Sequence, residues 1–219
     1  MRIFFPALIS LLLIISCKQK NTDPGGKITL SEIRSPADSL LLSDSTWGGI
    51  TALTDFDELK QLYSESNIKD ERICGPECVD SFDVTRIYPG SNREFIVYWQ
   101  DSLYHKQIGF IRCLSADAPY YTEAGVKIGT TLNELLRING KPIAFFGFGW
   151  DYGGGIISLN HGVLEKTNVR FNLALAEQND DNSVYGDTEL NSDMPAVKKL
   201  LDKIYVSELF LPFNKQASK

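Results

Sequence analysis

Histidine is scarce in this chain and basic residues are in the minority, and each shortage excludes a class of ligand. The 219 residues include only two histidines, His105 and His161, so a zinc site would have few ligands to draw on besides cysteine. The 22 lysines and arginines are outnumbered by 28 aspartates and glutamates, which gives a formal net charge of −6. A chain of this charge is a poor binder of nucleic acid. We expect no metal, no cofactor and no nucleic acid to be bound.

An apolar run near the start of the chain is too short to cross a bilayer comfortably. It follows Arg2 and covers residues 3–15 with a single serine inside it, which is typical of a secretory signal. Ile14-Ile15-Ser16-Cys17 resembles the lipobox of bacterial lipoproteins, and the resemblance implies cleavage before Cys17 and acylation of that cysteine. Acylation by more than one chain anchors a protein stably to a membrane. We therefore predict a signal peptide over residues 1–16 and lipidation of Cys17.

The residues after Cys17 predict a tether. Residues 18–27 read KQKNTDPGGK, a polar stretch without apolar periodicity, and we assign residues 17–46 to a tether and an N-terminal segment. Lys18 is not the aspartate that is associated with retention in the inner membrane. By resemblance to that sorting rule, we expect an exported lipoprotein in the outer membrane, facing the periplasm.

Three further cysteines, Cys74, Cys78 and Cys113, would reach an oxidising compartment after export. Their number predicts one disulfide and one spare thiol. A bridge between Cys74 and Cys78 is favoured over one to Cys113, although connectivity cannot be read from a sequence. The nearer pair is separated by three residues, one more than in the thioredoxin motif, which argues against a redox role.

An internal repeat organises the rest of the chain. Residues 49–59 (GITALTDFDEL) align without gaps on residues 125–135 (GVKIGTTLNEL) and share Gly, Thr, Glu and Leu at equivalent positions. Two copies of one structural unit explain this match. We therefore assign residues 47–121 to repeat 1 and residues 122–213 to repeat 2.

Each copy predicts a helix followed by an antiparallel meander. Both helices open with a capping box, formed by Asp55 with Glu58 and by Thr131 with Glu134. After each helix the apolar period falls from helical to two. This change predicts strands in the first copy over residues 84–88, 94–99 and 107–114, and in the second over residues 143–152, 155–160 and 168–176.

The end of the chain predicts one more helix, from Met194 to about Glu208. Five apolar side chains share one face at helical spacing: Val197, Leu200, Leu201, Ile204 and Tyr205. The expected fold class is therefore α+β, with two tandem helix-plus-antiparallel-sheet repeats and a C-terminal helix.

The segment FFGFGWDYGGGI, residues 145–156, is rich in rings and glycines. On a strand, alternation places Phe146, Phe148, Trp150 and Tyr152 on one face and Phe145, Gly147, Gly149, Asp151 and Gly153 on the other. Glycines in a strand indicate that another backbone or a partner approaches closely. A helix over the aromatic face would make the rings core, whereas a helix over the glycine face would leave them exposed as anchors for a protein partner. The candidate partner-binding residues are Phe146, Phe148, Trp150, Asp151, Tyr152 and Trp99.

Asp151 and the acidic segment 177–189 have simpler explanations than catalysis or calcium binding. Nothing beside Asp151 supplies a second acid, a base or a metal, and donation from the turn amides of Gly153 and Gly154 to its carboxylate explains it equally well. In segment 177–189, Val184 stands where an EF-hand needs a ligand oxygen, so we expect a solvated loop. The two histidines are expected at the surface rather than in a catalytic triad.

The second copy carries a family resemblance. Gly125–Leu135, followed by Asn139-Gly140-Lys141-Pro142, resembles the signature of small lipoproteins of the SmpA/OmlA type, which take part in outer-membrane assembly. The chain is also similar to the tandem helix-plus-sheet repeat of the β-lactamase inhibitory protein. The resemblance implies a helix layer over an antiparallel sheet, a non-catalytic role and the binding of protein surfaces.

These observations favour one function and leave two rivals open. We expect a lipid-anchored envelope protein that is not an enzyme and that binds another envelope protein, in outer-membrane assembly or as an inhibitor. The first rival is a small-ligand binder or hydrolase with a pocket around Trp150, Asp151 and Tyr152. The second is a purely structural lipoprotein. Exposure of the aromatic face and convergence of titrating groups in a hollow distinguish the three.

Overall fold

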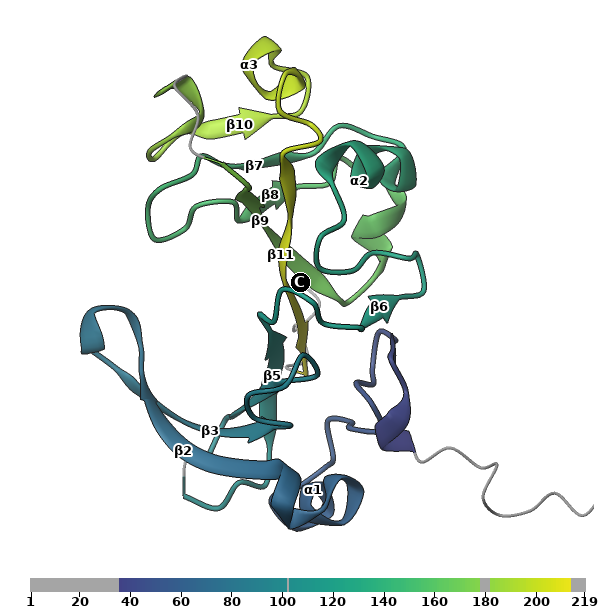
Figure 1. Ribbon diagram of the computed structural model, residues 1–219, viewed down its shortest axis with the longest axis vertical. Coiled ribbons are helices and arrows are strands. Elements are labelled where there is room, and N and C mark those ends of the chain that lie inside the picture. The colour runs from purple at the N-terminus through teal and green to yellow at the C-terminus, as the bar shows by residue number, and fades with distance from the viewer. Residues whose placement is uncertain (1–35, 102, 178–181, 214–219) are drawn as a thin grey trace, which may run out of the picture. The chain divides into compact units, whose positions relative to one another are not determined.

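The computed structural model describes residues 36–101, 103–177 and 182–213 (Figure 1). The predicted signal peptide, Cys17 and most of the tether lie outside the described residues. The fold is α+β, as predicted, with antiparallel sheets and three α-helices in the described part of the chain. None of these helices is long and apolar enough to span a membrane.

The largest sheet has six strands. Their order is β2 (Ile68–Cys74), β3 (Ser81–Ile87), β4 (Phe95–Trp99), β5 (Ile108–Cys113), β11 (Ile204–Pro212) and β9 (Arg170–Leu175). All neighbouring strands in it are antiparallel, and the first four form a continuous meander. The strands predicted from alternation over residues 84–88, 94–99 and 107–114 are therefore confirmed. The charged strand β2 was not predicted, because the sequence IKDERIC has only two apolar residues besides its cysteine.

Two smaller sheets complete the strand inventory of the described residues. β10 (Glu189–Asn191), β7 (Ala144–Phe146) and β8 (Ile156–Ser158) form an antiparallel sheet in that order, and β1 (Leu41–Leu42) pairs in parallel with β6 (Tyr121–Thr122). An isolated bridge between Gly155 and Asn172 joins the first of these to β9 of the large sheet. The strands of the second half of the chain thus continue the sheet of the first half.

The two main helices form as the capping boxes predict. α1 (Phe56–Tyr63) begins after Asp55, and α2 (Leu132–Asn139) begins after Thr131. In both, the cap side chain accepts from the amide of the glutamate three residues on, and that glutamate accepts from the cap amide. The shared device agrees with two copies of one unit, but the duplication itself stays a prediction.

The predicted C-terminal helix over Met194–Glu208 is wrong. Only α3 (Pro195–Lys198) is helical there, and residues 204–212 form β11 between β5 and β9. Ile204, Val206, Leu209 and Leu211 are all fully buried, and a bulge between Val206 and Glu208 keeps the apolar side chains on the core side. The spacing of the apolar residues in this segment fits a helix and a strand equally well. The strand forms because β5 and β9 offer backbone hydrogen bonds on both of its sides.

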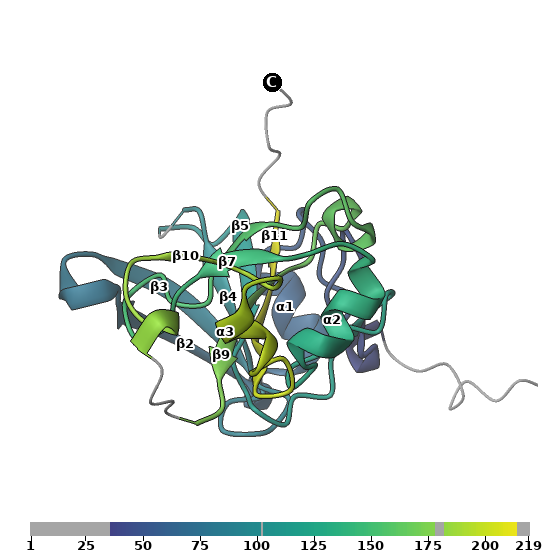
Figure 2. The same cartoon turned by 90° about the horizontal axis from the view of Figure 1, so that it is seen from above.

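The main core lies on one face of the large sheet, beneath α1 and α2 (Figure 2). Trp47 is fully buried there, with its ring centroid 5.5 Å from that of Phe95 and 5.4 Å from that of Tyr120. Cys113 is a free, buried cysteine in the same core, where burial raises its thiol pKa to about 11. Cys74 and Cys78 form the disulfide that was favoured from their spacing.

Candidate binding surface

The face of the large sheet opposite the main core carries a row of aromatic rings, which we call the outer face. Residues paired directly across antiparallel strands project from the same face. Tyr98 pairs with Val84 on β3 and with Phe110 on β5, and Phe110 pairs with Pro212 on β11. A second row joins Ile96, Arg112, Phe210 and Arg170 across four strands. None of these side chains belongs to the main core.

The rings of the outer face contact one another along the row. Tyr98 and Phe110 stack with ring centroids 4.2 Å apart, and Phe82 meets Tyr98 edge-on at 6.1 Å. Tyr98 forms a small second apolar cluster with Val84 and Ile96, both almost fully buried, and Phe110 and Ile73 pack against it. Phe82 remains 41% exposed, and Phe110 is half-buried. The row therefore offers ring surface to solvent on a rigid support.

Charged groups flank the row and are paired with each other. Arg112 donates to Glu208 through Nε at 2.5 Å and through a terminal nitrogen at 3.0 Å, and Asn172 donates to the same carboxylate at 3.0 Å. Burial by itself lowers the pKa of the Arg112 guanidinium, but the hydrogen bond and charge of Glu208 outweigh burial and raise the pKa overall. The Glu208 side chain is only 9% exposed. The Glu208 carboxylate therefore accepts three hydrogen bonds on the outer face.

Two shallow hollows lie on either side of Phe210. One has a volume of about 350 Å³ and is lined by Phe110, Arg112, Asn172, Glu208, Phe210 and Pro212 together with Gly109. The other, of about 270 Å³, lies between Phe210, Arg170, Asn172 and the residues of β8. Pockets that enclose drug-sized ligands occupy roughly 300–1,000 Å³ and are concave. One hollow lies at the lower end of that range and the other just below it, and both are open on a sheet face.

The strand predicted over residues 143–152 is only partly formed. β7 ends at Phe146, and residues 149–154 form turns. Phe148 therefore leaves the expected face: it is 6% exposed and packs on Phe145, 5.8 Å away between centroids, in the main core. The alternation predicted for Phe148 is wrong because β7 ends at Phe146 and the chain bends at Gly149, whose φ is +82°.

Phe146, Trp150 and Tyr152 form a ring cluster apart from Phe148. Phe146 and Trp150 meet edge-on at 5.7 Å, and Trp150 and Tyr152 at 5.3 Å. Tyr152 is 68% exposed. A Cβ on Gly155 would lie 3.5 Å from the Phe146 ring, and Gly155 pairs with Asn172 of the outer face. The cluster therefore extends the outer face beyond β9.

Two of the other candidates lie elsewhere. Trp99 is 8% exposed in the main core, where its Nε1 donates to Thr85 at 2.8 Å and its ring stacks on His105 at 4.9 Å. The surface position expected for His105 is wrong, since its side chain is 13% exposed. Asp151 is exposed in a turn.

The turn around Asp151 is held by backbone carbonyls. Gly153 N donates to Trp150 O at 2.9 Å, and Gly154 N donates to Phe146 O at 3.0 Å. The expected donation from these amides to the Asp151 carboxylate is therefore wrong. The glycine run does permit the close backbone approach that was predicted: Gly154 lies against Leu173 of β9, whose amide donates to Gly154 O at 2.9 Å.

The remaining polar candidates do not converge. His161 is 97% exposed and lies 3.5 Å from Glu165. Residues 178–181 of the acidic segment 177–189, with the first position of the calcium motif, lie outside the described residues, and Asn182–Val184 form a short 3₁₀ helix. Over residues 36–101, 103–177 and 182–213, no group of three or more His, Cys, Asp or Glu side chains is placed to hold a metal ion.

Sequence signals for the outer face were present but were not combined. Alternate positions on three strands carry its aromatic and charged side chains, at 96 and 98, at 110 and 112, and at 208 and 210. They were missed because the last strand was predicted to be a helix, which separated Glu208 and Phe210 from the sheet. Pairing β11 with β5 brings the three sets together.

No protein-family model matches the chain, and no curated protein is significantly similar to it in sequence. Among solved structures, the chain is similar to the crystal structure of the uncharacterized protein YfeY from Escherichia coli. The identity is 13% and the TM-score 0.46, and the match covers 78% of this chain and 98% of that one.

Proposed function

We propose that this chain is an exported lipoprotein that binds another envelope protein through its outer face and does not catalyse a reaction. The observation that carries the proposal is the row of rings on the outer face, partly exposed and flanked by an Arg112–Glu208 pair that is already formed. Aromatic and arginine side chains are enriched at the energetic centres of protein interfaces. A preformed, hydrogen-bonded surface of this kind binds with little loss of side-chain entropy.

The rival reading, a pocket for a small ligand around Trp150, Asp151 and Tyr152, has less support. The hollow beside Trp150 has a volume of about 400 Å³ and is lined mainly by apolar side chains and glycines. Among the described residues, Glu177 is the one acid that lines it, and Glu177 accepts from Lys203 at 2.9 Å. Asp151 does not line it. Within the described part of the chain, no second acid or base lies beside Glu177 in this hollow to support acid–base chemistry.

A photocrosslinking experiment tests the proposal. A benzoylphenylalanine at Phe210 of the full lipidated chain is expected to capture one envelope protein in living cells, identified by mass spectrometry. The matched control is Leu53, which is 87% exposed in the loop before α1. The proposal would be contradicted if Phe210 gave no adduct, or if Phe210 and Leu53 captured the same proteins.

The anchor is a separate prediction. Replacing Cys17 by alanine is expected to abolish metabolic incorporation of an alkyne-labelled palmitate and to leave the 16-residue signal peptide attached, because the resemblance to the lipobox makes Cys17 both the cleavage site and the acylated residue. Gel fluorescence after click labelling measures the first effect, and an immunoblot, which also detects the unlabelled chain, measures the added mass of the signal peptide. Cys113→Ser is the control, since Cys113 is buried and its loss should leave labelling unchanged. An unlabelled wild-type chain would contradict the prediction.

A further inference from the structure

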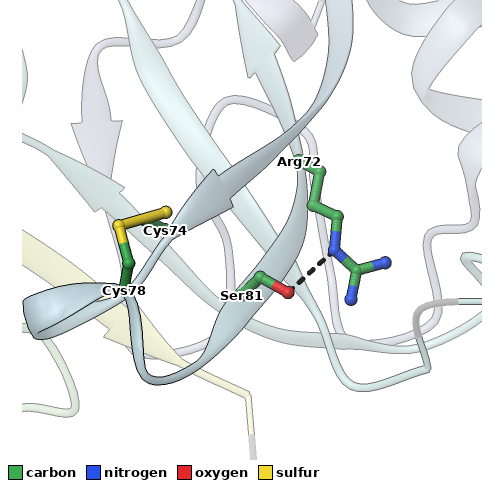
Figure 3. Close-up of a disulfide and its surroundings, with 4 residues drawn as sticks. All are labelled: Arg72, Cys74, Cys78 and Ser81. Carbon is green, nitrogen blue, oxygen red and sulfur yellow. Dashed lines mark hydrogen bonds between the residues drawn. A yellow bond between two sulfur atoms is a disulfide. The ribbon is translucent and has the colours of Figure 1, made fainter.

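The loop between β2 and β3 is closed by a disulfide at the end of a hairpin. We call residues 74–81 the tip. Cys74 and Cys78 are bonded across it with their Cα atoms 4.7 Å apart, and Ser81 pairs with Cys74 where the strands meet. Figure 3 shows the disulfide beside the hydrogen bond from Arg72 Nε to Ser81 Oγ, of 2.8 Å. In Figures 1 and 2 the tip extends away from the other strands of its sheet.

The tip is held in one conformation by several constraints. Gly75 N donates to Asp80 O at 2.8 Å, and Cys78 N donates to Gly75 O at 3.1 Å. Glu77 and Cys78 both have positive φ, at 52° and 55°, a conformation that is unfavourable for residues other than glycine. The disulfide closes a loop of five residues and restricts the backbone conformations that Glu77 and Cys78 can adopt. Such a loop is organised before it meets a partner.

The tip presents an apolar side chain among acids. Val79 is 79% exposed, and Glu77 and Asp80 next to it are also exposed. The nearby base Arg72 is engaged with Ser81 and lies 3.7 Å from Asp83. The tip therefore offers a branched apolar group within a negative field. That combination complements an apolar pocket with a basic rim.

Recognition by the tip is distinct from addition of a strand to the sheet edge. β2 is the edge strand, and four charged side chains occupy Lys69–Arg72 at its centre. Charged edges oppose pairing with another chain. Phe82 follows the tip directly and begins the aromatic row of the outer face. A partner that covers the row would therefore meet the tip at its margin.

We propose that the tip inserts Val79 into an apolar pocket, rimmed by lysine or arginine side chains, on the envelope protein that the outer face binds. The inference rests on the proposed function and adds the chemistry of the partner's site. The disulfide lowers the entropy lost on docking, because the loop is already ordered. Glu77 and Asp80 steer the basic rim toward Val79 and make the association rate dependent on salt.

Crosslinking from two positions separates this inference from the proposed function. Benzoylphenylalanine at Val79 is expected to capture the same protein as benzoylphenylalanine at Phe210, as identified by mass spectrometry. Benzoylphenylalanine at Leu53 should not capture that protein. An adduct from Phe210 with none from Val79 overturns the inference about the tip and leaves the outer face as the interface. The absence of adducts from both positions overturns this inference and the proposed function together.

Affinity for the protein captured from Phe210 then measures the chemistry of the tip. Val79→Asp is expected to weaken binding about 10–100-fold, as the loss of a buried apolar anchor does, and Leu53→Asp, its matched control, should change nothing. Glu77→Gln with Asp80→Asn should slow association and flatten its dependence on salt. Equal affinity of Val79→Asp and Leu53→Asp overturns the inference, and unchanged thermal unfolding of both variants shows that they are folded.

Discussion

Replacing Gly154 by alanine is expected to lower the free energy of unfolding by about 2–5 kcal/mol. Gly154 has a φ of +77°, and a Cβ there would fall on the carbonyl of Leu173, far inside the 3.0 Å below which real Cβ contacts are essentially never found. The left-handed conformation costs alanine about 1–2 kcal/mol, and forcing two backbones apart adds about 1–3 kcal/mol. Urea unfolding followed by circular dichroism measures the loss.

Gly125 provides the matched control for this substitution. Its φ of +83° is almost the same, and nothing lies within 4 Å of a Cβ built on it. Gly125→Ala should therefore show only the conformational cost, and the difference between the two variants isolates the contact with Leu173. The amide of Leu173, which donates to Gly154 O, should also exchange with deuterium faster in Gly154→Ala. Equal destabilisation by the two alanines would contradict the close approach.

Replacing Glu208 by alanine is expected to cost about 2–3 kcal/mol of unfolding free energy. The change leaves Arg112 and Asn172 without their shared acceptor on the outer face. Breaking a fully buried ion pair costs about 3–5 kcal/mol, and the loss is smaller here because the Arg112 side chain is 36% exposed. Chemical denaturation at neutral pH gives the value directly.

Two controls separate burial from charge. Glu177→Ala also removes one ion pair, with Lys203, but its side chain is 71% exposed, and solvent screening should leave the unfolding midpoint unchanged. The double variant Arg112→Met with Glu208→Leu removes both charges together and should recover most of the stability lost in Glu208→Ala. A Glu208→Ala variant as stable as Glu177→Ala would show that the pair contributes nothing.

Local signals predicted much of the fold. The capping boxes located the starts of α1 and α2, because a cap needs only four neighbouring residues to form its hydrogen bonds. Alternation located β3, β4 and β5, in which Ile87, Val97 and Ile111 face the main core and are fully buried. The number of cysteines predicted one disulfide, and the structure shows that it joins Cys74 and Cys78.

Long-range pairing decided the parts that sequence reasoning misassigned. β11 has apolar residues that fit a helix as well as a strand, and only the unpaired edges of β5 and β9 select the strand. Strand β2 is charged along its length and is extended because β3 lies beside it. The outer face depends on both strands. The sequence therefore predicted the ring cluster of Phe146, Trp150 and Tyr152 but not the rings that β3 to β11 place on the outer face.

The position of β11 in the sheet has a consequence for how the chain folds. β11 is the last of the described elements along the sequence, yet it lies between β5 and β9 and supplies hydrogen bonds to both. Sequence-distant pairing of this kind raises contact order and slows folding. Until β11 has been synthesised and has paired, β5 retains an open edge that can join to other chains. β11 thus completes the sheet, and a chain truncated before residue 204 would lack that strand.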